Sequence, residues 1–529
     1  MSVELPPPAT PQQGTVDQLQ SQAGSGVVVA FQTYQLHVAA SGILDEAAIQ
    51  NAVGLADNLS NAVRNIGAAA YLAGYPASQV TYALSGNDLY VLVLPGKISG
   101  VKASDALKPY LNGLESADPM RDSDLIGHTT LASLAADRAG IDVYPVFEPD
   151  GNGGQVLDFE KNNKDADPTT VRVEFGNPGN RFASRYFLDM DLKTGSIWGD
   201  EFRVFAREGI QNLDDKGKPG DYHEQDLVWT RVTPWGLFGL DGRFVNYNYT
   251  SPVVAPATTG TNVLGRIWVG EAQWLYPLFA NFNSRWTVQA KADRTSKSGK
   301  LDSSAGSPSQ EYQRELYTSG ELGTTYLRNF AFLGHRWDLA SGVSVRKGFG
   351  DRTPDTSFNP AAGDTSPMHG DEGYLLFRPT ASLKFYWTGA LVTGVEASGQ
   401  FSNDSVPEQQ QWVLGGLGNL TSSLPGVAVG DKGYLARAYT ELTLPLIAGI
   451  ELKPRVLIEH GAAKFAKPLA GQSTDTQQVT DAGLELGFKF TQIVDGTLAY
   501  AKSFDDKGVT SSTKQDADAR VYFRISIKL

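Results

Sequence analysis

The chain has no cysteine among its 529 residues. This absence excludes disulfide bonds, thiolate metal sites and a cysteine nucleophile. It also fits an exported protein, because a chain without thiols cannot mispair under oxidising conditions. The six histidines are scattered, without an HExxH motif or a pair at i and i+4, so the sequence predicts no zinc site. We expect no metal, no other cofactor and no enzymatic activity.

Long apolar runs are also missing. No stretch approaches the roughly 18 consecutive apolar residues that a membrane helix needs. The opening MSVELPPPATPQQ has neither the basic nor the apolar segment of a signal peptide. The chain is therefore either cytosolic or a mature chain that begins with a replacement Met1. The strand pattern described below favours the mature chain.

Charge is sparse, at 19% of residues, and the formal net charge is −13. Nucleic-acid phosphates need a basic face, so this balance argues against a nucleic-acid partner. Glycine (56 residues) and aromatic residues (10%) are abundant instead, which is typical of turns and interfacial girdles. Asp214-Asp215 and Asp505-Asp506 are predicted to be solvated acidic turns, with a bound calcium as the less favoured alternative.

The first part of the chain predicts two small α+β modules. Residues 1–26 are polar, and we expect a disordered leader in which Thr15 could cap a short helix to Gln22. Over residues 27–96 a strand (VVVAFQTYQLHV), two helices and a hairpin (QVTYAL and LYVLVL) follow. The same order recurs over residues 97–163, with ASDALKPYLNGLES as its first helix and IDVYPVFEP and QVLDFEK as its hairpin.

After Pro168 the helical pattern ends and strand alternation continues to the last residue. RFASRYFLDMDL places on one face Phe182, Ser184, Tyr186, Leu188, Met190 and Leu192. RVYFRISIKL places on one face Val521, Phe523, Ile525, Ile527 and Leu529. Short turns alternate with long polar segments, which together with apolar-out, polar-in strands is typical of an outer-membrane barrel. Residues 169–529 are thus predicted to form a membrane β-barrel of about 16 antiparallel strands.

A soluble β-sandwich or solenoid is the alternative for this region. A chain that ends on a strand favours the barrel, because the last strand can close onto the first. Five tryptophans lie in the predicted strands and indicate an interfacial belt, with sugar stacking as the alternative: Trp229, Trp235, Trp268, Trp274 and Trp286.

The glycine-rich stretch LGGLGNLTSSLPGVAVGDKGYLARAYTEL covers residues 414–442. It is not a phosphate-binding loop, because it lacks the third glycine, the following helix and a Gly-Lys-Ser sequence. Its second half, YLARAYTEL, alternates as a strand does.

Paired modules ahead of a C-terminal barrel resemble the two-partner secretion transporters (TpsB), whose modules are called POTRA domains. GNDLYVLVLPGKISGV resembles the end of that family's first module, and VRVEFGNPGNRFASRYFLDMDL resembles its first barrel hairpin. The resemblance implies a translocator in the bacterial outer membrane, in contact with lipid and lipopolysaccharide. Its periplasmic modules would capture an unfolded TpsA-like exoprotein (adhesin, haemolysin or toxin), which then passes through the pore. The alternatives are an assembly factor that inserts other barrels, a substrate-specific porin, and a secreted β-rich enzyme or lectin.

The resemblance also places a loop near residues 415–433 inside the barrel lumen. Its flanks match at Leu414, Gly415, Gly416, Gly430, Asp431, Gly433 and Tyr434. The family's tip reads Val-Arg-Gly-aromatic, but the aligned residues here are Leu420-Thr421-Ser422-Ser423, without the arginine. The usual acidic partner of that arginine corresponds to Glu459, which precedes Gly461 on the wall. We expect Glu459 to be solvated, or paired with Lys432 or Lys453. The resemblance leaves open whether the leader helix plugs the pore.

Capture of an extended substrate is expected to use strand addition to a module's sheet edge. QVTYAL, with Val80 and Tyr82, is one candidate edge. VYPVFEP, with Val143 and Val146, is the other, because its prolines suit an edge strand better than a central one.

Overall fold

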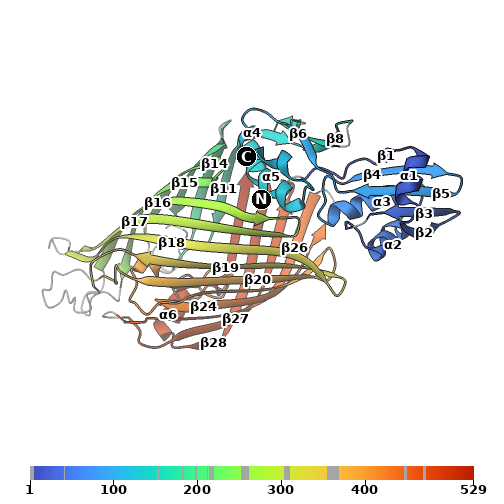
Figure 1. Ribbon diagram of the computed structural model, residues 1–529. Coiled ribbons are helices and arrows are strands. Elements are labelled where there is room, and N and C mark those ends of the chain that lie inside the picture. Colours follow the sequence, from blue (N-terminus) through green and yellow to red (C-terminus); the bar gives the residue numbers. More distant parts are fainter. Residues whose placement is uncertain are drawn as a thin grey trace.

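The computed structural model describes residues 5–40, 42–151, 154–160, 162–165, 167–180, 184–196, 199–210, 213, 220–251, 261–302, 310–353, 369–445, 449–468 and 472–529. The chain forms a closed antiparallel barrel with two small α+β modules at one end, as the sequence predicts (Figure 1). Within these ranges, no helix is both long and apolar enough to cross a bilayer.

The barrel strands alternate up and down around the ring in chain order. They are β11 (Thr169–Gly176), β12 (Phe187–Gly195), β13 (Asp200–Gly209), β14 (Tyr222–Thr233), β15 (Gly236–Ser251), β16 (Thr261–Ala280), β17 (Ser284–Asp302), β18 (Gln310–Phe332), β19 (His335–Gly348), β20 (Leu375–Tyr386), β21 (Leu391–Gln400), β24 (Lys432–Leu442), β25 (Leu444–Pro445), β26 (Ile450–Lys464), β27 (Gln477–Phe490), β28 (Val494–Lys507) and β29 (Val521–Lys528). Both β24 and β25 pair with β26 and act as one interrupted strand, so the ring has 16 strands. The last strand, β29, pairs with β11, and the predicted closure is confirmed.

The two faces of the barrel wall differ in chemistry. Apolar side chains such as Met190, Leu484 and Ile525 are exposed on the outside. The inside carries cross-strand ion pairs, for example Arg207 Nη2 at 2.7 Å from Asp189 Oδ2. The predicted alternation of the first hairpin is correct from Phe187 onward. It fails before that point, because Ser184 belongs to the preceding loop and residues 181–183 lie outside the described residues.

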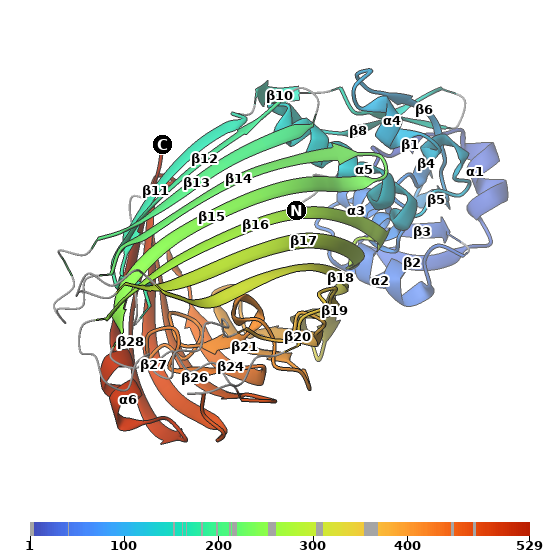
Figure 2. The ribbon, with the colours of Figure 1, turned by 90° about the vertical axis from the view of Figure 1, so that its left-hand side faces the viewer.

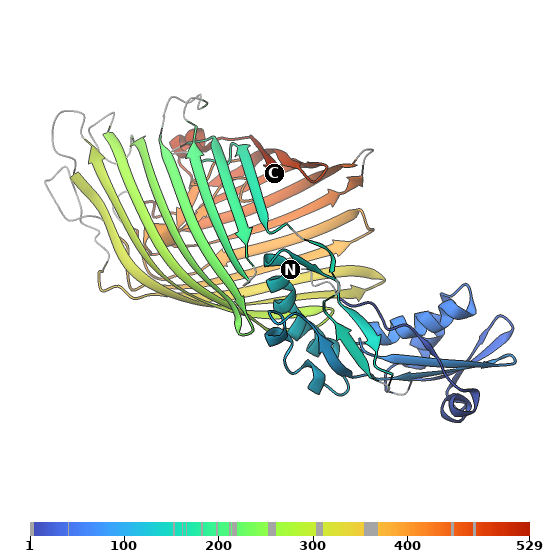
Figure 3. The ribbon, with the colours of Figure 1, turned by 90° about the horizontal axis from the view of Figure 1, so that it is seen from above.

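Connections at the two ends of the barrel differ in length. Residues 234–235, 281–283, 333–334, 387–390 and 491–493 are short turns at the end that carries the modules. The longest connections, residues 349–374 and 401–431, leave the opposite end. Figure 3 shows both ends, with the strands inclined across the barrel and the modules beside the short turns. This asymmetry is that of outer-membrane barrels, whose long loops face outward from the cell.

The first module contains β2 (Val27–Phe31), β3 (Tyr34–Ala39), α2 (Glu46–Gly54), α3 (Leu59–Leu72), β4 (Gln79–Ser85) and β5 (Asp88–Leu94). The stretch expected to be one strand is a hairpin, β2–β3, because Gln32 turns the chain with φ 55°. The sheet order is β1-β4-β5-β3-β2, in which β1 is Gln12–Gln13 of the leader.

The expectation of a disordered leader is wrong for its described residues. Helix α1 (Val16–Ala23) packs Leu19 and Ala23 against Ala83 and Tyr90 of the first module. Figure 1 shows α1 on the module, away from the barrel, so this helix does not plug the lumen. The apolar face of this helix thus packs on the sheet of the first module, a contact that the sequence alone could not predict.

The second module contains β6 (Ile98–Lys102), α4 (Lys108–Leu111), η1 (Leu114–Ser116), α5 (Asp122–Arg138), β7 (Ile141–Val143), β8 (Val146–Pro149), β9 (Gln155–Asp158) and β10 (Asn162–Asp165). The long helix expected over ASDALKPYLNGLES is broken into α4 and η1, because Gly113 takes a left-handed conformation. The strand expected over IDVYPVFEP is divided at Tyr144-Pro145. Strand β7 pairs with β10, whereas β8 pairs with β9 in the expected hairpin.

The second module is docked onto the short-turn end of the barrel. Tyr110 Oη donates to the Val232 carbonyl at 2.7 Å. Arg138 donates from Nη1 to the Gly199 carbonyl at 3.3 Å, and its Nη2 lies 3.6 Å from Glu201 Oε1. The first module also reaches the barrel, since the ring of Tyr71 stacks on Phe282 with centroids 4.8 Å apart. These contacts hold the modules at the barrel mouth.

Replacing Arg138 by Ala is expected to loosen the second module from the barrel. The guanidinium is 7% exposed, and its loss removes a charge partner of Glu201 and the donor to Gly199. Breaking a buried pair of this kind costs on the order of 3 kcal/mol. Limited proteolysis in detergent should therefore cleave the 160–168 segment at least several-fold faster. Lys108→Ala, which removes a surface ion pair with Asp105, is the matched control. Equal cleavage rates for all three proteins would contradict this role.

Candidate functional site

Residues 401–431, here called the lumen loop, connect β21 to β24 and fold into the barrel. The lumen loop contains η4 (Glu408–Gln410), β22 (Trp412–Leu414) and β23 (Ala428–Gly430), and β22 pairs with β23 as a hairpin. Figure 2 looks toward the end with the long connections and shows this orange segment inside the ring of strands. Its contacts include two arcs of the wall, β17–β20 and β26–β29, which are separated by β21 and β24 on one side and by β11–β16 on the other.

The first contact of the lumen loop is an ion pair between Glu408 and Lys297 of β17. The Lys297 side chain is fully buried (0% exposed), and Glu408 Oε2 also accepts from Gln313 Nε2 at 2.8 Å. The backbone N–H of Glu408 donates to Glu315 Oε1 at 3.2 Å. A buried charge is stable only when it is paired and hydrogen-bonded, so this contact fixes the loop to the wall.

Gln410 extends the same attachment to the next strands. Its Oε1 accepts from Arg346 Nη1 at 3.1 Å and from Arg378 Nη2 at 3.2 Å. Arg346 is in turn paired with Asp293 at 3.1 Å and with Glu321 at 2.8 Å. One neutral side chain of the lumen loop thereby joins a charge network on β17–β20.

The hairpin of the lumen loop depends on glycine at its first bend. Gly415 has φ 111°, and a Cβ there would lie 2.1 Å from the Leu424 carbonyl oxygen. Gly416 follows with φ 106°. Only glycine adopts such a backbone without strain, which explains the two adjacent glycines in the sequence.

The tip of the hairpin is held by two carboxylates of the wall. The Thr421 N–H donates to Glu459 Oε2 of β26 at 2.7 Å, and the Ser422 N–H donates to Asp481 Oδ2 of β27 at 2.8 Å. Glu459 and Asp481 are cross-strand partners, and both are fully buried. The expectation of a solvated Glu459 is therefore wrong. We call this arrangement the tip latch.

The cation of the tip latch comes from the wall. Arg437 of β24 is the cross-strand partner of Glu459, with Nε 3.3 Å from Glu459 Oε1. Its Nη2 also donates to Glu485 Oε2 at 3.2 Å. The two lysines considered from the sequence lie elsewhere: Lys453 pairs with Glu451 at 2.9 Å, and Lys432 is opposite Lys464. Thr421, which stands where the family has arginine, contributes a backbone donor instead.

Apolar packing supports the polar latch. Leu414 and Leu420 are fully buried in a cluster with wall residues and with Ala517 of α6 (Ser511–Ala517). Gly461 makes room for them, because a Cβ there would lie 3.0 Å from Leu414 Cδ1 and 3.3 Å from Leu420 Cδ1. Tyr522 of β29 donates its hydroxyl to the Ser423 carbonyl at 2.6 Å. The tip thus contacts strands β26, β27 and β29 of the wall.

Asp431 fixes the base of the lumen loop. Its carboxylate accepts from the Val406 N–H at 3.0 Å and from the Ala466 N–H at 2.7 Å. Burial raises the pKa of the Asp431 carboxyl to about 6, while the two amide donors act against the rise. Gly430 and Gly433 lie against the backbone of β26, where a Cβ would approach within 2.4 and 2.3 Å.

One residue grouped with the loop in the sequence, Tyr434, does not face it. Tyr434 is exposed on the outer face, with its hydroxyl 2.9 Å from His460 Nε2. Glu459 and His460 therefore lie on opposite faces of β26, as strand geometry requires.

The candidate capture edges differ in accessibility. Strand β4, with Val80 and Tyr82, is covered by leader strand β1, which pairs in parallel with Gln12 opposite Thr81 and Gln13 opposite Tyr82. Strand β8, with Val146, is at the end of the sheet order β6-β9-β8. Val143 lies on β7 and is paired with Asn162 of β10.

Among the residues that the structure describes, no three His, Asp or Glu side chains gather as metal ligands would. Asp505 and Asp506 lie in β28 rather than in a turn, which corrects the expectation from the sequence. Asp214 and Asp215 lie outside the described residues.

No family model matches the chain. By sequence it is similar to the heme/hemopexin transporter protein HuxB of Haemophilus influenzae, with 22% identity over 316 residues, which are 57% of this chain and 50% of that protein. The HuxB of strain 86-028NP is 22% identical over 358 residues, or 65% of this chain and 58% of that protein. The chain thus spans about half the length of the relatives it matches.

Solved structures resemble the chain over nearly its whole length. CdiB from Escherichia coli has a TM-score of 0.66 at 15% identity, covering 99% of this chain and 94% of CdiB. CdiB from Acinetobacter baumannii has a TM-score of 0.61 at 11% identity, covering 97% and 96%. BamA from Haemophilus ducreyi lacking POTRA domains 1–3 has 0.51 at 13% identity, covering 94% and 99%. HuxB and CdiB are two-partner secretion transporters. The resemblance seen in the sequence is confirmed as a shared fold: two POTRA-like modules and a 16-strand barrel.

Glu459→Ala is expected to release the tip of the lumen loop. The Thr421 N–H would lose its acceptor in a buried place, which costs about 1–3 kcal/mol. Loop-displaced states should become roughly 5- to 150-fold more populated, and the mean single-channel conductance in planar bilayers should rise. Glu459→Gln keeps an acceptor oxygen and should lie closer to the wild type.

Glu451→Ala is the matched control, because Glu451 lies on the same strand but pairs with Lys453 on the surface. Identical conductance histograms for Glu459→Ala and the wild type would show that the tip latch does not hold the loop.

Proposed function

We propose that this protein is an outer-membrane translocator that passes an extended exoprotein from the periplasm to the cell surface. The observation that carries the proposal is a closed barrel whose lumen holds a loop attached to two arcs of the wall, with two modules at the mouth. Fold similarity to the two CdiB structures and sequence similarity to HuxB support it. The barrel would lie in outer-membrane lipid and lipopolysaccharide, with the modules in the periplasm.

The lumen suits a polypeptide in extended form. Its wall carries paired charges, such as Arg203 with Asp191 at 2.8 Å and Lys291 with Glu271 at 3.1 Å. Pairs of this kind keep the wall polar without a large net field, so a chain of mixed sequence can pass without strong binding. The lumen loop occupies the path, and we infer that it shifts during transport. Release of the tip latch would leave the Glu408–Lys297 attachment as a tether.

Substrate capture would use the edges of the modules. Strand β8 is at the end of its sheet order, so an extended chain can add to it directly. Strand β4 is occupied by the leader, whose Gly14 N–H donates to the Tyr82 carbonyl at 2.9 Å. The leader thus stands where a substrate strand would add, and capture at β4 requires that the substrate replace it. Until a substrate arrives, the leader would satisfy the hydrogen-bonding groups of the β4 edge and so prevent unspecific strand pairing.

An assembly factor that inserts other barrels is the second candidate, favoured by the similarity to BamA. That similarity has a lower TM-score than the similarity to either CdiB structure. The two functions differ in which proteins depend on the chain.

Replacing residues 27–161 by a Gly-Ser linker should abolish secretion of the exoprotein while the barrel still inserts, because both capture edges are removed. Secretion is measured as exoprotein in the medium, and insertion as the heat-modifiable mobility of the barrel on gels. Unchanged secretion would end the proposal for the modules. A loss of many other outer-membrane proteins, together with the exoprotein, would favour the assembly factor.

Locking the leader onto β4 should block capture reversibly. The chain contains no native cysteine, so Gln12→Cys with Thr81→Cys offers a single disulfide between cross-strand partners. Such partners are about 4.8 Å apart, which suits the bond. Secretion should fall at least 10-fold under oxidising conditions and recover with reductant. Each single cysteine variant is the control. Full secretion with the disulfide formed would show that β4 is not a required edge.

A further inference from the structure

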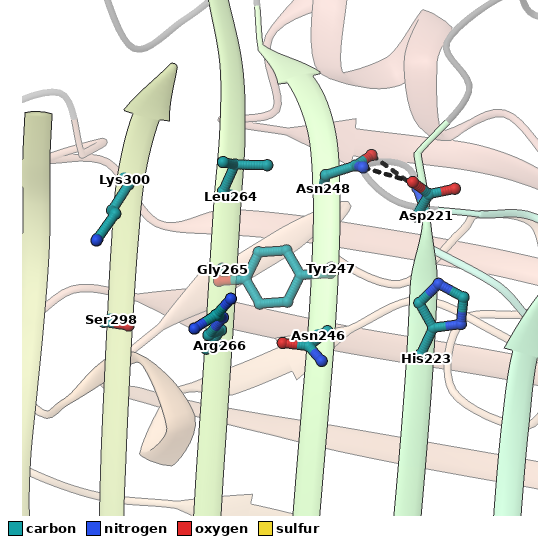
Figure 4. A pocket seen from close by; sticks show the side chains of 10 residues that line it. All are labelled: Asp221, His223, Asn246, Tyr247, Asn248, Leu264, Gly265, Arg266, Ser298 and Lys300. Atoms are coloured by element: carbon teal, nitrogen blue, oxygen red, sulfur yellow. Dashed lines mark hydrogen bonds between the residues drawn. The ribbon is translucent and has the colours of Figure 1, made fainter. Parts of the chain in front are cut away.

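A shallow cavity of about 470 Å³ opens beside strands β14–β17 near the end with the long connections (Figure 4). Its lining combines apolar surface, such as that of Leu264 and Tyr247, with polar groups that run from Asp221 and His223 of the β14 side to Arg266 of β16 and Lys300 of β17. It is separate from the lumen loop and its latch.

The cations of this cavity point away from the lumen. Arg266 lies on the same face of β16 as Leu264 and Trp268, which are 40% and 48% exposed on the lipid side. Val263 and Ile267, which are on the alternate positions of the same strand, face inward and are buried. Alternation along a strand therefore sends the Arg266 guanidinium outward, and the same holds for Lys300 relative to buried Lys297 of β17.

Register gathers these groups at one height. His223, Asn246, Arg266 and Ser298 are successive cross-strand partners on β14–β17, and Arg314 of β18 is opposite Ser298. Lys300 is diagonal to Arg266, two residues beyond its partner Ser298, which places the two Cβ atoms about 8 Å apart. Arg314 is in the row itself, next to Ser298. Three cations of adjacent strands thus share one patch, which we call the outer cationic patch: Arg266, Lys300 and Arg314.

The height of this patch matches the boundary of a bilayer. Trp286 and Trp268 are 46% and 48% exposed on the outer face. Trp268 of β16 is opposite Ser296 of β17, so its height can be compared with that of Trp286 along β17. Positions 286 and 296 are separated by about 25 Å along the barrel axis, if each tilted residue advances about 2.5 Å. That separation equals the apolar band of an outer-membrane barrel, with an aromatic girdle at each side. Arg266 is one step beyond the girdle, about 5 Å into the headgroup zone.

The positive charge in the patch is available. Among the described residues, neither the Arg266 guanidinium nor the Lys300 ammonium has an ion pair or a hydrogen-bond partner. The nearby acids bind other partners: Asp221 Oδ2 accepts from Asn248 Nδ2 at 2.5 Å, and Glu208 Oε2 contacts His223 Nδ1 at 2.6 Å. Glu311 is opposite Lys300 in register without an ion-pair contact. By contrast, the lumen cations Arg207 and Arg346 are matched by acids.

We propose that the outer cationic patch binds the phosphate groups of lipopolysaccharide in the outer leaflet. Arginine and lysine are suited to phosphate monoesters, the first by its planar fork and the second as a point charge. Phe244 and Trp268, one step below and exposed, offer apolar contact to acyl chains. A phosphate above acyl chains is the arrangement of lipid A, whereas a free phosphate ion would have no use for the aromatic part.

The inference rests on the outer-membrane placement within the proposed function, and it does not depend on transport of an exoprotein. It assigns the β14–β18 sector as the side of the barrel that holds a particular lipid, while the opposite sector carries the tip latch.

The test uses the full chain in detergent, titrated with bisphosphorylated lipid A in mixed micelles and followed by native mass spectrometry. We expect Arg266→Gln with Lys300→Gln to weaken lipid A binding at least 10-fold. Lys502→Gln is the matched control, because Lys502 is exposed on the outer face of β28, one step beyond exposed Tyr500, and should leave binding unchanged.

Two further ligands identify the source of the phosphate. Dephosphorylated lipid A should bind at least 10-fold more weakly than the bisphosphorylated form, and inorganic phosphate should not compete at millimolar concentration. The proposal is overturned if the double variant binds lipid A like the wild type, if dephosphorylation has no effect, or if free phosphate competes fully. Secretion of the exoprotein is a separate readout, so its failure with intact lipid A binding would count against translocation alone.

Discussion

The hydrocarbon core of a membrane offers no partner to a backbone N–H or C=O, and this constraint organises the barrel. Each strand must pair on both sides, so the ring must close, and the pairing of β29 with β11 does this. Closure also separates two environments on one set of strands. Outside, the side chains meet lipid; inside, they meet water and one another. The alternation that the sequence shows from Phe187 to the last strand is the direct result.

Closure of the ring also creates a lumen. A wide ring of 16 strands cannot be filled by its own side chains, so it holds a space that must be either open or occupied. Here the lumen loop occupies it, attached at Glu408 to one arc and at Thr421 to the other. The two attachments differ in kind. One is an ion pair with the fully buried Lys297, while the other consists of backbone amides that donate to two buried acids, of which Glu459 is paired with Arg437.

Much of this architecture could be predicted from the sequence, because it follows from local periodicity. Period-two alternation with short and long connections predicted the barrel, and the strand at the end of the chain predicted its closure. What could not be predicted depends on register. Arg437 is visible in YLARAYTEL, but only the hairpin geometry places it opposite Glu459. Asp481 was missed for the same reason, since nothing in its own segment marks it as a neighbour of Glu459. The leader failed differently: its helix and strand are stabilised by a sheet that lies far along the chain.

The tip latch has an implication for which substitutions it tolerates. A side-chain anchor ties a contact to one residue type, whereas the donors at positions 421 and 422 belong to the peptide bond itself. Any amino acid except proline carries such a donor, so the hydrogen bond to Glu459 does not require an arginine at position 421. The specific side chains of this contact belong to the barrel wall: Glu459 and Asp481 accept the two amide hydrogens, and Arg437 pairs with Glu459. In this molecule the charged side chains that hold the loop tip belong to the barrel wall and not to the loop.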